Sequence, residues 1–582
     1  MSGPEHLPPT ADDDAVPASQ ARALALAERW SVEDPDPMHR EALRAELDAA
    51  AGSGPEAEAA RASLASRFSG PLAFGTAGLR AEEGPGESRM NRLVVRRTAA
   101  GLARHLWEGV GEDAAAPLAV VGYDARRGSL GFAQDTAAVL TAAGVQVVLL
   151  PDALPTPVLA FAVRHLSADA GVMVTASHNP PADNGYKVYL GGRMTDEAGR
   201  GAQIVSPADV AIAELIDHEA WTADIPLAED GWTVAGDELL EAYREAALAV
   251  LDEDRHPDRA LRIVYTPLHG VGGAVLPGLL DEAGFGPVHV VPEQAEPDPA
   301  FPTVAFPNPE EPGAMDLALA LAAEVDADLV IANDPDADRL ALAAPFPGPD
   351  GTRVWRMLSG DAVGTLLGAH LMPALAAAER SVANSVVSSP QLAALAEAQS
   401  VAHHVTLTGF KWISRAPQLA FGYEEALGYC VDPDMVRDKD GITAALVAAE
   451  LVAGLAARGR TVADALADVD AVTGSMPSGQ VSVRVADLSV IPRTMAALRA
   501  QGPATLAGEP VTVRRDLAEG GAGLPPTDAL LFATASGTRV LVRPSGTEPK
   551  LKCYLGARDA DPAVAAERLE ALRAEVAALV GG

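Results

Sequence analysis

Short apolar runs alternate with helical patterns along most of the chain, in three successive blocks. We expect strands at the apolar runs and helices where apolar residues recur every three or four positions. In chain order these elements are 118–124, 131–143, 145–151 and 171–177, then 261–267, 288–292, 315–325 and 328–334, then 381–389, 403–408 and 442–457. Such alternation is typical of parallel or mixed sheets with helices on their faces. The pattern therefore predicts three similar α/β units.

The two ends of the chain depart from this pattern. Residues 1–70 carry helical patterning mixed with Pro, Gly and acidic residues, which predicts a helical N-terminal extension. Near the C-terminus the strands are shorter, at 538–544 and 551–557, and a final helix is expected over 561–580. Pro/Gly-rich joins mark boundaries near 224–236, 344–352 and 474–480. After the extension we therefore expect domains at 71–240, 241–348, 349–475 and 476–582.

Composition narrows the kinds of partner. The 582 residues carry 44 basic and 80 acidic side chains, a net charge of −36. This argues against nucleic acid or an anionic membrane as a partner, but not against an anionic substrate at a local positive site. Cys430 and Cys553 make no disulfide framework or zinc-ligand set. No apolar run reaches the roughly 18 residues of a membrane span, and no signal peptide is evident at the N-terminus. We expect a soluble protein of a reducing compartment.

The first loop that carries chemistry is TASHNPP (175–181), at the end of an apolar run. The two prolines stop a helix or strand from continuing. Ser177 is therefore expected at the rim of a sheet, and a serine is a poor nucleophile unless a base is near or the incoming group is activated. His178 and Lys187 are the local candidates for proton handling. A Ser/Asn/Pro turn with an incidental histidine is the alternative interpretation.

The second loop is NDPDADR (333–339), also at the end of an apolar run. A loop that curls Asp334, Asp336 and Asp338 around one hard cation would relieve their repulsion and supply oxygen ligands for Mg²⁺. An EF-hand calcium loop does not fit, because Arg339 stands where it needs glycine and Pro345 where it needs glutamate. A plain acidic turn remains the alternative. Magnesium beside a serine points to phosphoryl chemistry.

Two further segments suit sugars and phosphates. In GYEEALGY (422–429) the carboxylates suit paired hydrogen bonds to sugar hydroxyls, although an acidic helix N-terminus would look the same. In RPSGTEPK (543–550) the hydroxyls, the approachable amides and the guanidinium suit phosphate, with a hairpin that binds no ligand as the alternative. Among 44 basic residues, five are lysines, and all lie in or beside these loops or in TGFKW (408–412): Lys187, Lys411, Lys439, Lys550 and Lys552. A lysine kept in an arginine-rich chain suggests a role that arginine cannot fill.

With TASHNP, DPDADR, GYEEALGY and RPSGTEPK in this order, the chain resembles the α-D-phosphohexomutase superfamily over roughly residues 70–560. FGTAGLR (74–80) and Asp124-Ala125-Arg126 are similar to further motifs of that family. Together with GFKW and GYEEAL, FGTAGLR looks most like the branch of longer bacterial phosphoglucomutases and animal phosphopentomutases. The resemblance implies an α/β fold of four domains around a central cleft. Three would be related mixed-sheet α/β domains, and the fourth a smaller C-terminal α+β domain.

The same resemblance implies a phosphosugar mutase that works through a phosphoserine. Ser177 would carry the phosphoryl group, and Mg²⁺ would be held by Asp334, Asp336, Asp338 and Ser177. Lys187 would be the general base, with His178 and Arg339 beside the reacting groups. The residues expected to bind substrate are Arg80, Arg126, Thr408, Gly409, Lys411, Glu424, Lys439, Arg543, Ser545, Gly546 and Thr547. A sugar 1,6-bisphosphate would be the intermediate and activator.

The resemblance leaves the preferred sugar open. Many hexomutases have Glu-x-Ser in the sugar loop, but here Ala426 replaces the serine, so one sugar contact is missing. Glucose 1-phosphate to glucose 6-phosphate is favoured, with phosphomannomutase and phosphopentomutase as alternatives. Two other functions are alternatives to the mutase. A metallophosphatase with a serine nucleophile would need no second site that binds phosphate. A phosphosugar-binding regulator without catalytic activity would be expected to lack the serine or the aspartates, which are all present here. We expect a monomer or small homo-oligomer in the cytoplasm, where phosphorylated sugars are retained.

Overall fold

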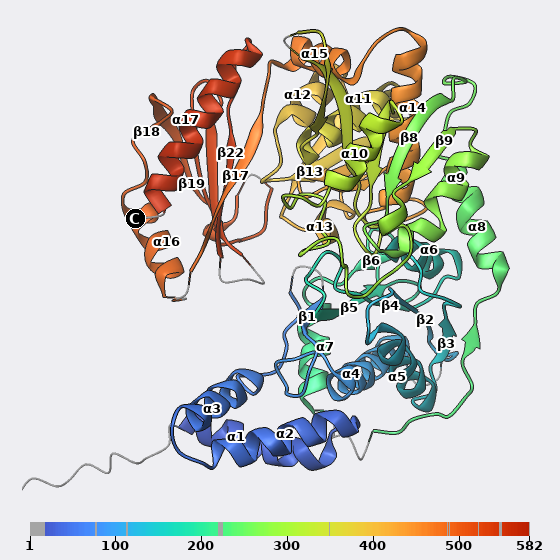
Figure 1. The fold of residues 1–582 in the computed structure, drawn as a ribbon, viewed down its shortest axis with the longest axis vertical. Helices are drawn as coiled ribbons and strands as arrows, with labels where there is room; N and C mark the ends of the chain where they lie inside the picture. Colours follow the sequence, from blue (N-terminus) through green and yellow to red (C-terminus); the bar gives the residue numbers. More distant parts are fainter. Residues whose placement is uncertain are drawn as a thin grey trace, which may run out of the picture.

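The computed structural model consists of an N-terminal helical bundle followed by four sheets (Figure 1). It describes residues 18–75, 78–111, 114–218, 225–348, 350–485, 487, 489–521, 523–545 and 550–580. The bundle comprises α1 (Ala18–Glu33), α2 (Pro37–Ala50) and α3 (Pro55–Arg67). Trp30 and Phe68 meet edge to face in its core, and Leu93 of the next domain joins the same apolar cluster. The bundle is therefore packed on the first sheet domain.

The first sheet is mixed, in the order β1-β5-β4-β2-β3-β7, with β6 paired to β5. Its strands are β1 (Leu79–Glu82), β2 (Leu118–Tyr123), β3 (Gln146–Leu149), β4 (Ala170–Val174), β5 (Asp183–Leu190), β6 (Ala202–Gln203) and β7 (Thr233–Val234). Its helices are α4 (Arg92–Val110), α5 (Ser129–Ala142), α6 (Thr156–His165) and α7 (Ala208–His218). Every residue of β4 is buried, as expected of an interior strand covered on both faces.

The second sheet has the order β12-β11-β10-β8-β9. Its elements are α8 (Asp237–Leu248), β8 (Ala260–Thr266), η2 (Val271–Ala274), α9 (Leu276–Glu282), β9 (Gly286–Val290), η3 (Pro292–Gln294), α10 (Asp316–Glu324), β10 (Leu329–Ala332), β11 (Ala341–Pro347) and β12 (Arg353–Met357). Two of the expected domain limits fall inside this unit. Helix α8 runs across 240, and β12 pairs with β11, so the second sheet continues past 348.

The third sheet has the order β14-β13-β15-β16. Its elements are α11 (Gly360–Ala377), β13 (Ser381–Ser385), α12 (Gln391–Ala398), β14 (Ala402–Thr406), α13 (Phe410–Ile413), β15 (Leu419–Glu424), β16 (Gly428–Cys430), α14 (Gly441–Ala457) and α15 (Val462–Thr473). Asp440 caps α14 by accepting hydrogen bonds from the N–H groups of Ile442 and Thr443.

One four-strand unit recurs in these three sheets. The unit is β3-β2-β4-β5 in the first sheet, β9-β8-β10-β11 in the second and β14-β13-β15-β16 in the third. Within each unit, the strand that comes first in chain order (β2, β8 or β13) lies between two parallel partners. The strand that comes fourth pairs antiparallel with the third. The prediction of three related mixed-sheet α/β domains is therefore confirmed. The last sheet differs, because all its strand pairs are antiparallel.

The C-terminal sheet has the order β17-β22-β21-β20-β19-β18. Its elements are β17 (Ser478–Arg484), α16 (Val490–Ala500), β18 (Thr505–Leu506), β19 (Glu509–Asp516), η4 (Leu517–Glu519), β20 (Leu530–Thr534), β21 (Arg539–Pro544), β22 (Lys550–Gly556) and α17 (Pro562–Val580). An apolar cluster that includes Val387, Leu541 and Tyr554 joins it to the third domain. The expected smaller α+β domain at the C-terminus is thus confirmed.

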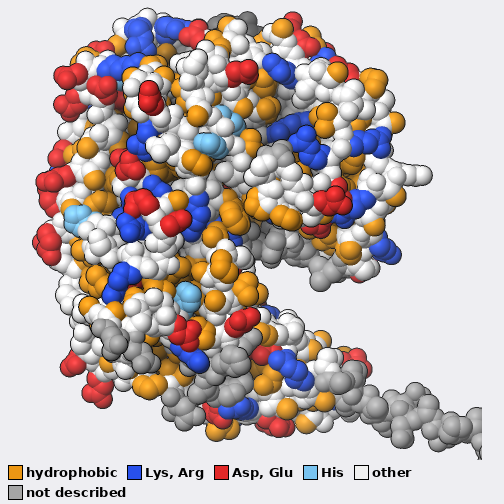
Figure 2. Space-filling view, turned by 180° about the vertical axis from the view of Figure 1, so that it is seen from behind, with side chains coloured by type: hydrophobic (Ala, Val, Ile, Leu, Met, Phe, Trp, Pro, Cys, Tyr) orange, Lys and Arg blue, Asp and Glu red, His pale blue; other side chains and the backbone are white. Residues whose placement is uncertain are grey.

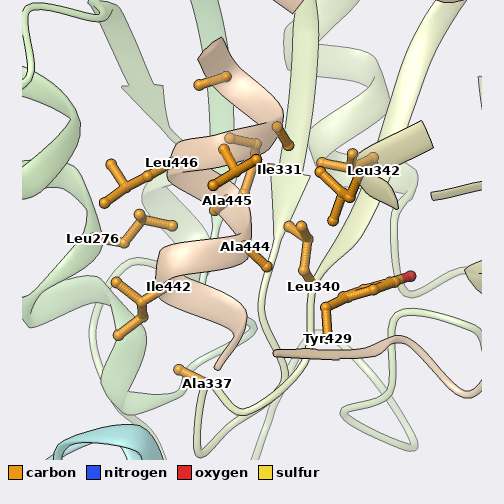
Figure 3. Packing of buried hydrophobic residues seen from close by; sticks show 14 of the residues in the cluster. Leu276, Ile331, Ala337, Leu340, Leu342, Tyr429, Ile442, Ala444, Ala445 and Leu446 are labelled. Atoms are coloured by element: carbon orange, nitrogen blue, oxygen red, sulfur yellow. The ribbon is translucent and has the colours of Figure 1, made fainter. Parts of the chain in front are cut away.

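Helix α14 contributes to the largest apolar cluster among the described residues, which extends over parts of the first three domains. Its side chains lie between Leu276 on one side and the strand residues Ile331 and Leu342 on the other (Figure 3). Within the described part of the chain no single helix is long and apolar enough to span a membrane. The sharply bent pair α14 and α15 has the length and composition of a span, but α14 is almost wholly buried in this core.

Candidate active site

Three loops occupy the same position in the three repeated units. Each follows the third strand of its unit, β4, β10 or β15, and leads into the antiparallel fourth strand. Each also holds one non-glycine residue with a left-handed backbone: Ser177 (φ 51°), Ala337 (φ 55°) and Leu427 (φ 64°). Such residues persist only where the surrounding structure holds them, and they gather at functional sites. The three turns are therefore rigid platforms for the side chains beside them.

The first two loops meet at Ser177. Its hydroxyl donates a hydrogen bond to Oδ2 of Asp334 at 2.6 Å, and its backbone N–H donates to the hydroxyl of Thr175 at 2.9 Å. Oδ1 of Asp334 accepts the backbone N–H of Arg339 at 3.0 Å. Ser177 and Asp334 are both almost completely buried. A serine and an aspartate from separate domains are thus held in direct contact.

Asp334, Asp336 and Asp338 form one buried cluster with oxygens within 4.8 Å of one another. Burial and the other two carboxylates raise the pKa of Asp334 well above its usual range. Burial would also raise the pKa values of Asp336 and Asp338, but the ammonium group of Lys187 lowers both, together with the Thr156 hydrogen bond at Asp336 and the charges of Lys439 and Arg339 at Asp338. Oδ1 of Asp336 and Oδ1 of Asp338 are both buried and accept no hydrogen bond from any residue that the structure describes. Unpartnered hard oxygens of this kind fit a divalent cation.

Two buried lysines face the carboxylate cluster. Nζ of Lys187 lies 2.7 Å from Asp336 and 2.8 Å from Asp338. Lys439, which comes from the third domain, reaches the same oxygen of Asp338 at 3.1 Å. Burial opposes the charge on both lysines, but the carboxylates overcome it and raise both pKa values. Both side chains are therefore ammonium ions, and they join all three α/β domains at one carboxylate.

His178 and two arginines complete this region. Nδ1 of His178 lies 3.2 Å from the hydroxyl oxygen of Ser177. Burial and the guanidinium groups of Arg339 and Arg80 hold the pKa of His178 well below its usual range, so its imidazole is neutral at neutral pH. Arg339 lies 3.8 Å from both Asp334 and Asp338 and donates to the carbonyl of Ala426 at 2.9 Å. Arg80 approaches the side chain of Asn179 at 3.5 Å.

Arg126 does not lie where a substrate-binding residue is expected. Its two terminal nitrogens donate four hydrogen bonds, to the carbonyl oxygens of Ser177, Asn179, Pro180 and Asp183, at 2.7–2.9 Å. The guanidinium is buried and lies 3.4 Å from Asp124. These contacts leave Arg126 no free pair of N–H groups for a phosphate. Its side chain instead stabilises the backbone of the serine loop.

The remaining predicted residues lie on the third and the C-terminal domains. Thr408 and Gly409 (φ 108°) precede α13, and Lys411 in its first turn lies 3.3 Å from the carbonyl of Gly75. Burial lowers the pKa of Lys411 and raises that of the partly exposed Glu424.

Arg543 lies at the end of β21, and Ser545 follows with its N–H bound to the carbonyl of Lys550 at 2.8 Å. Gly546 and Thr547 lie outside the described residues. A deep hollow separates this C-terminal domain from the N-terminal bundle (Figure 2).

Three residues at this site were not predicted from the sequence. The hydroxyl of Thr156 donates to Asp336 at 2.7 Å, and Asp438 accepts from Tyr189 at 2.8 Å, which ties the third domain to the first. Glu310 lies within electrostatic reach of Arg339 and Lys552, and the desolvation of its carboxyl among the surrounding groups raises its pKa. No motif marks Thr156, whereas Asp438 stands directly before the predicted Lys439 in the segment RDKDG (437–441). For Glu310 the available signal was the dense run FPNPEEP (306–312).

Four domain-family models match the chain in succession. These are the alpha/beta/alpha domains I, II and III of phosphoglucomutase/phosphomannomutase, at residues 71–221, 241–345 and 359–471, and the C-terminal domain of the same family at 481–578. The matches follow the order of the four sheets.

Individual relatives agree with these matches. A protein of Haemophilus influenzae named "probable phosphomannomutase" is 48% identical over 477 residues, which is 81% of this chain and 94% of that protein. Human phosphopentomutase is 35% identical over 548 residues, covering 86% and 87% of the two chains. Staphylococcus haemolyticus phosphoglucomutase is 34% identical over 514 residues, covering 84% and 90%. A solved structure from Thermus thermophilus that carries the phosphomannomutase name aligns with a TM-score of 0.68 at 28% identity, over 88% of this chain and 100% of that one.

Proposed function

Because this chain belongs to the phosphoglucomutase/phosphomannomutase family, whose members are isomerases, we propose that it moves a phosphoryl group between the 1- and 6-positions of a hexose phosphate. Glucose 1-phosphate and glucose 6-phosphate are the favoured pair. The observation that carries the proposal is the 2.6 Å hydrogen bond from the Ser177 hydroxyl to Asp334, inside a buried cluster of three carboxylates. That arrangement unites a phosphoryl carrier with a site for a cation.

In the reaction that we propose, Ser177 carries a phosphoryl group in the resting enzyme. The free hydroxyl of the bound sugar monophosphate forms a new bond to this phosphorus while the bond to Ser177 Oγ breaks, and the hydroxyl proton passes to a base. The product is a sugar 1,6-bisphosphate. The bisphosphate then turns over in the cleft, its other phosphate returns to Ser177, and the proton returns to the sugar oxygen.

Asp334, Asp336 and Asp338 are the residues that would hold Mg²⁺, with Ser177 beside them. When bound there, the ion would neutralise charge on the transferred phosphoryl group and, by taking up carboxylate charge, lower the pKa of Lys187. Lys187 is our candidate for the base, since its Nζ lies beside the cluster. His178 is the second candidate, because it is neutral and 3.2 Å from Ser177 Oγ.

The other residues would position the sugar and its second phosphate. Glu424 would read sugar hydroxyls, and Arg543 with Ser545 would grip the phosphate that is not reacting. Arg80, with an N–H that has no partner in the described part of the chain, is suited to the reacting phosphate. Closure of the cleft would exclude water and so prevent hydrolysis of the phosphoserine.

The sugar is the open part of this proposal. The relatives carry the names of mannose, pentose and glucose enzymes. Ala426 offers no hydroxyl where many hexomutases have serine, so phosphomannomutase and phosphopentomutase activities are the alternatives. A metallophosphatase of the same serine and aspartates is a candidate of a different class. A phosphatase removes one phosphate and would need no second phosphate-binding residue such as Arg543 on the C-terminal domain.

One set of assays separates these functions. We would measure kcat/KM for glucose 1-phosphate, mannose 1-phosphate and ribose 1-phosphate with Mg²⁺ and a trace of the matching bisphosphate, and follow inorganic phosphate in parallel. The mutase proposal expects isomerisation with little phosphate release, and loss of at least about 10⁴-fold in kcat for Ser177→Ala. Ser69→Ala, at an exposed serine of the N-terminal region, is the matched control. Phosphate release without isomerisation would refute the mutase and favour the phosphatase.

A further inference from the structure

A second cluster of ligand-type side chains lies at the junction of the second and third domains. His256 lies between α8 and β8, His370 on α11 and Glu450 on α14, and one ligand atom of each lies within 4.8 Å of the others. The N–H of Gly441, at the start of α14, donates to the carbonyl of Ala337 in the aspartate loop at 3.2 Å, and Glu450 is about 14 Å further along that helix. The cluster is therefore separate from the three aspartates, and the mutase proposal makes no use of it.

The two oxygens of Glu450 have different partners. Oε1 accepts hydrogen bonds from the backbone N–H of Asp252 at 2.9 Å and from Arg259 at 3.3 Å. Oε2 faces Nε2 of His370 at 2.9 Å. One oxygen is thus fixed by the segment that enters the second sheet, while the other is turned toward an imidazole. Contacts of this kind orient the carboxylate ligands of metal sites.

The second imidazole lies beside Gly454 of α14. Glu450 and Gly454 share one face of α14. A Cβ on Gly454 would lie 3.9 Å from Nδ1 of His256. The rings of His256 and His370 have centroids 4.5 Å apart with an interplanar angle of 35°. Two imidazoles and a carboxylate therefore converge from three separate segments of the chain.

We propose that His256, His370 and Glu450 form a second metal site, which takes a borderline divalent cation such as Zn²⁺ and ties the second domain to the third. Two imidazole nitrogens and one carboxylate oxygen are a known donor set for zinc, with a fourth position left for water. The aspartate cluster, by contrast, offers only hard oxygens. The two sites are thus matched to different ions, and the second does not depend on the mutase activity.

Two arginines oppose a cation at this site. Arg259 is bound to Oε1 of Glu450 and lies over the ring of Phe285, and Arg458 lies near Gly454. Neither contact involves Oε2 of Glu450. Neutral imidazoles bind zinc through their lone pairs even in sites with three histidines and no carboxylate ligand.

The test uses the full-length protein, stripped with a chelator and held in excess Mg²⁺ so that the aspartates are occupied. Zn²⁺ is then titrated against a chromophoric zinc indicator, and Co²⁺ in a parallel experiment for the visible spectrum of a low-coordinate cobalt site. We expect the wild type to bind one more equivalent of Zn²⁺ than His256→Ala or His370→Ala. Glu450→Gln should weaken binding by at least about tenfold. His403→Ala is the matched control, since His403 is bound to Asn384 on the third sheet.

Thermal unfolding supplies the second readout. Zn²⁺ should raise the Tm of the wild type and of His403→Ala, and leave that of His256→Ala unchanged. His256 is partly exposed, so its variant should fold even if the more buried ligands do not tolerate replacement. Equal zinc stoichiometry in the wild type and both histidine variants, or an equal rise in Tm for His256→Ala, would overturn the proposal and leave a plain hydrogen bond between His370 and Glu450.

Discussion

Arg126 offers a direct test of how the serine loop is held. Four carbonyl oxygens of residues 177–183 accept its N–H groups, and Asp124 lies beside it. A lysine at this position keeps the positive charge beside Asp124. Its ammonium group, however, has three donors and no planar fork, so it cannot reach all four carbonyls. We therefore predict that Arg126→Lys leaves the domain folded but loosens the loop that carries Ser177.

The expected size of the effect follows from the lost hydrogen bonds. Losing two bonds from a charged donor, at about 1.5 kcal/mol each, removes about 3 kcal/mol from the loop. Ser177 keeps a left-handed backbone only while the loop is held, so it should then sample displaced positions. A displacement of about 1 Å costs roughly 100-fold in rate. Because the phosphoryl carrier moves and the sugar contacts do not, kcat should fall by about that factor, with KM changed less than about threefold.

The assay is the conversion of glucose 1-phosphate with Mg²⁺ and bisphosphate, coupled to oxidation of glucose 6-phosphate, with Tm measured in parallel. Arg127→Lys is the matched control, because Arg127 is the neighbouring residue and is exposed. Arg126→Ala is less useful, since it strands the buried carboxylate of Asp124 at a cost of about 3–5 kcal/mol. An unchanged kcat with a raised KM would refute the reasoning, because Arg126 would then grip the substrate as the sequence predicted.

Four further changes test other parts of the site. Gly441→Ala should destabilise the protein by about 1–3 kcal/mol in urea unfolding, because its Cβ would lie 2.2 Å from the carbonyl oxygen of Arg339; Gly278→Ala, with open space around it, should not. Asp336→Asn should weaken Mg²⁺ activation by at least about 100-fold in a metal titration, and unaltered activation would exclude Asp336 as a ligand. Arg543→Ala should raise KM about 10- to 100-fold with a smaller change in kcat, and an unchanged KM would place the second phosphate grip elsewhere. Burial, with Glu424 and Asp361, raises the pKa of Glu425 from 4.5 to about 7, so its stabilising contribution is complete below pH 4.5 and is lost as the pH rises through 7. The free energy of unfolding of Glu425→Gln should therefore rise by up to about 3 kcal/mol relative to that of the wild type as the pH increases through that window. If the two free energies differ by the same amount at every pH, the shift is contradicted.

The sequence predicts the three α/β units and the loops at Ser177, Asp334 and Glu424, because these depend on local patterns. An apolar run that ends in polar and turn-forming residues is visible without any knowledge of its neighbours. The contacts between units depend instead on how whole sheets pack. Lys439 meets Asp338 from about a hundred positions away, and nothing near either residue specifies that ion pair. For the same reason Arg126 was expected to bind substrate, since its motif shows a guanidinium but not the four carbonyls that occupy it.

Backbone contacts join the aspartate loop to the first and third domains. The N–H of Thr156 in the first domain donates to the carbonyl of Asp336 at 2.9 Å, and the N–H of Leu340 donates to the carbonyl of Leu427 in the third at 3.0 Å. The aspartate loop is therefore bonded to the first domain on one side and to the sugar loop on the other, and it cannot shift away from either without breaking these bonds.

The fourth domain is attached differently. Arg539 donates to the carbonyl of Ser388 and Ser478 to Asp361, both in the third domain, beside the small apolar cluster around Val387. These contacts bind the fourth domain to the third domain. If Arg543 grips the phosphate as proposed, closure of the fourth domain over the sugar would complete the site, while Ser177 and the carboxylates would keep their places for both half-reactions.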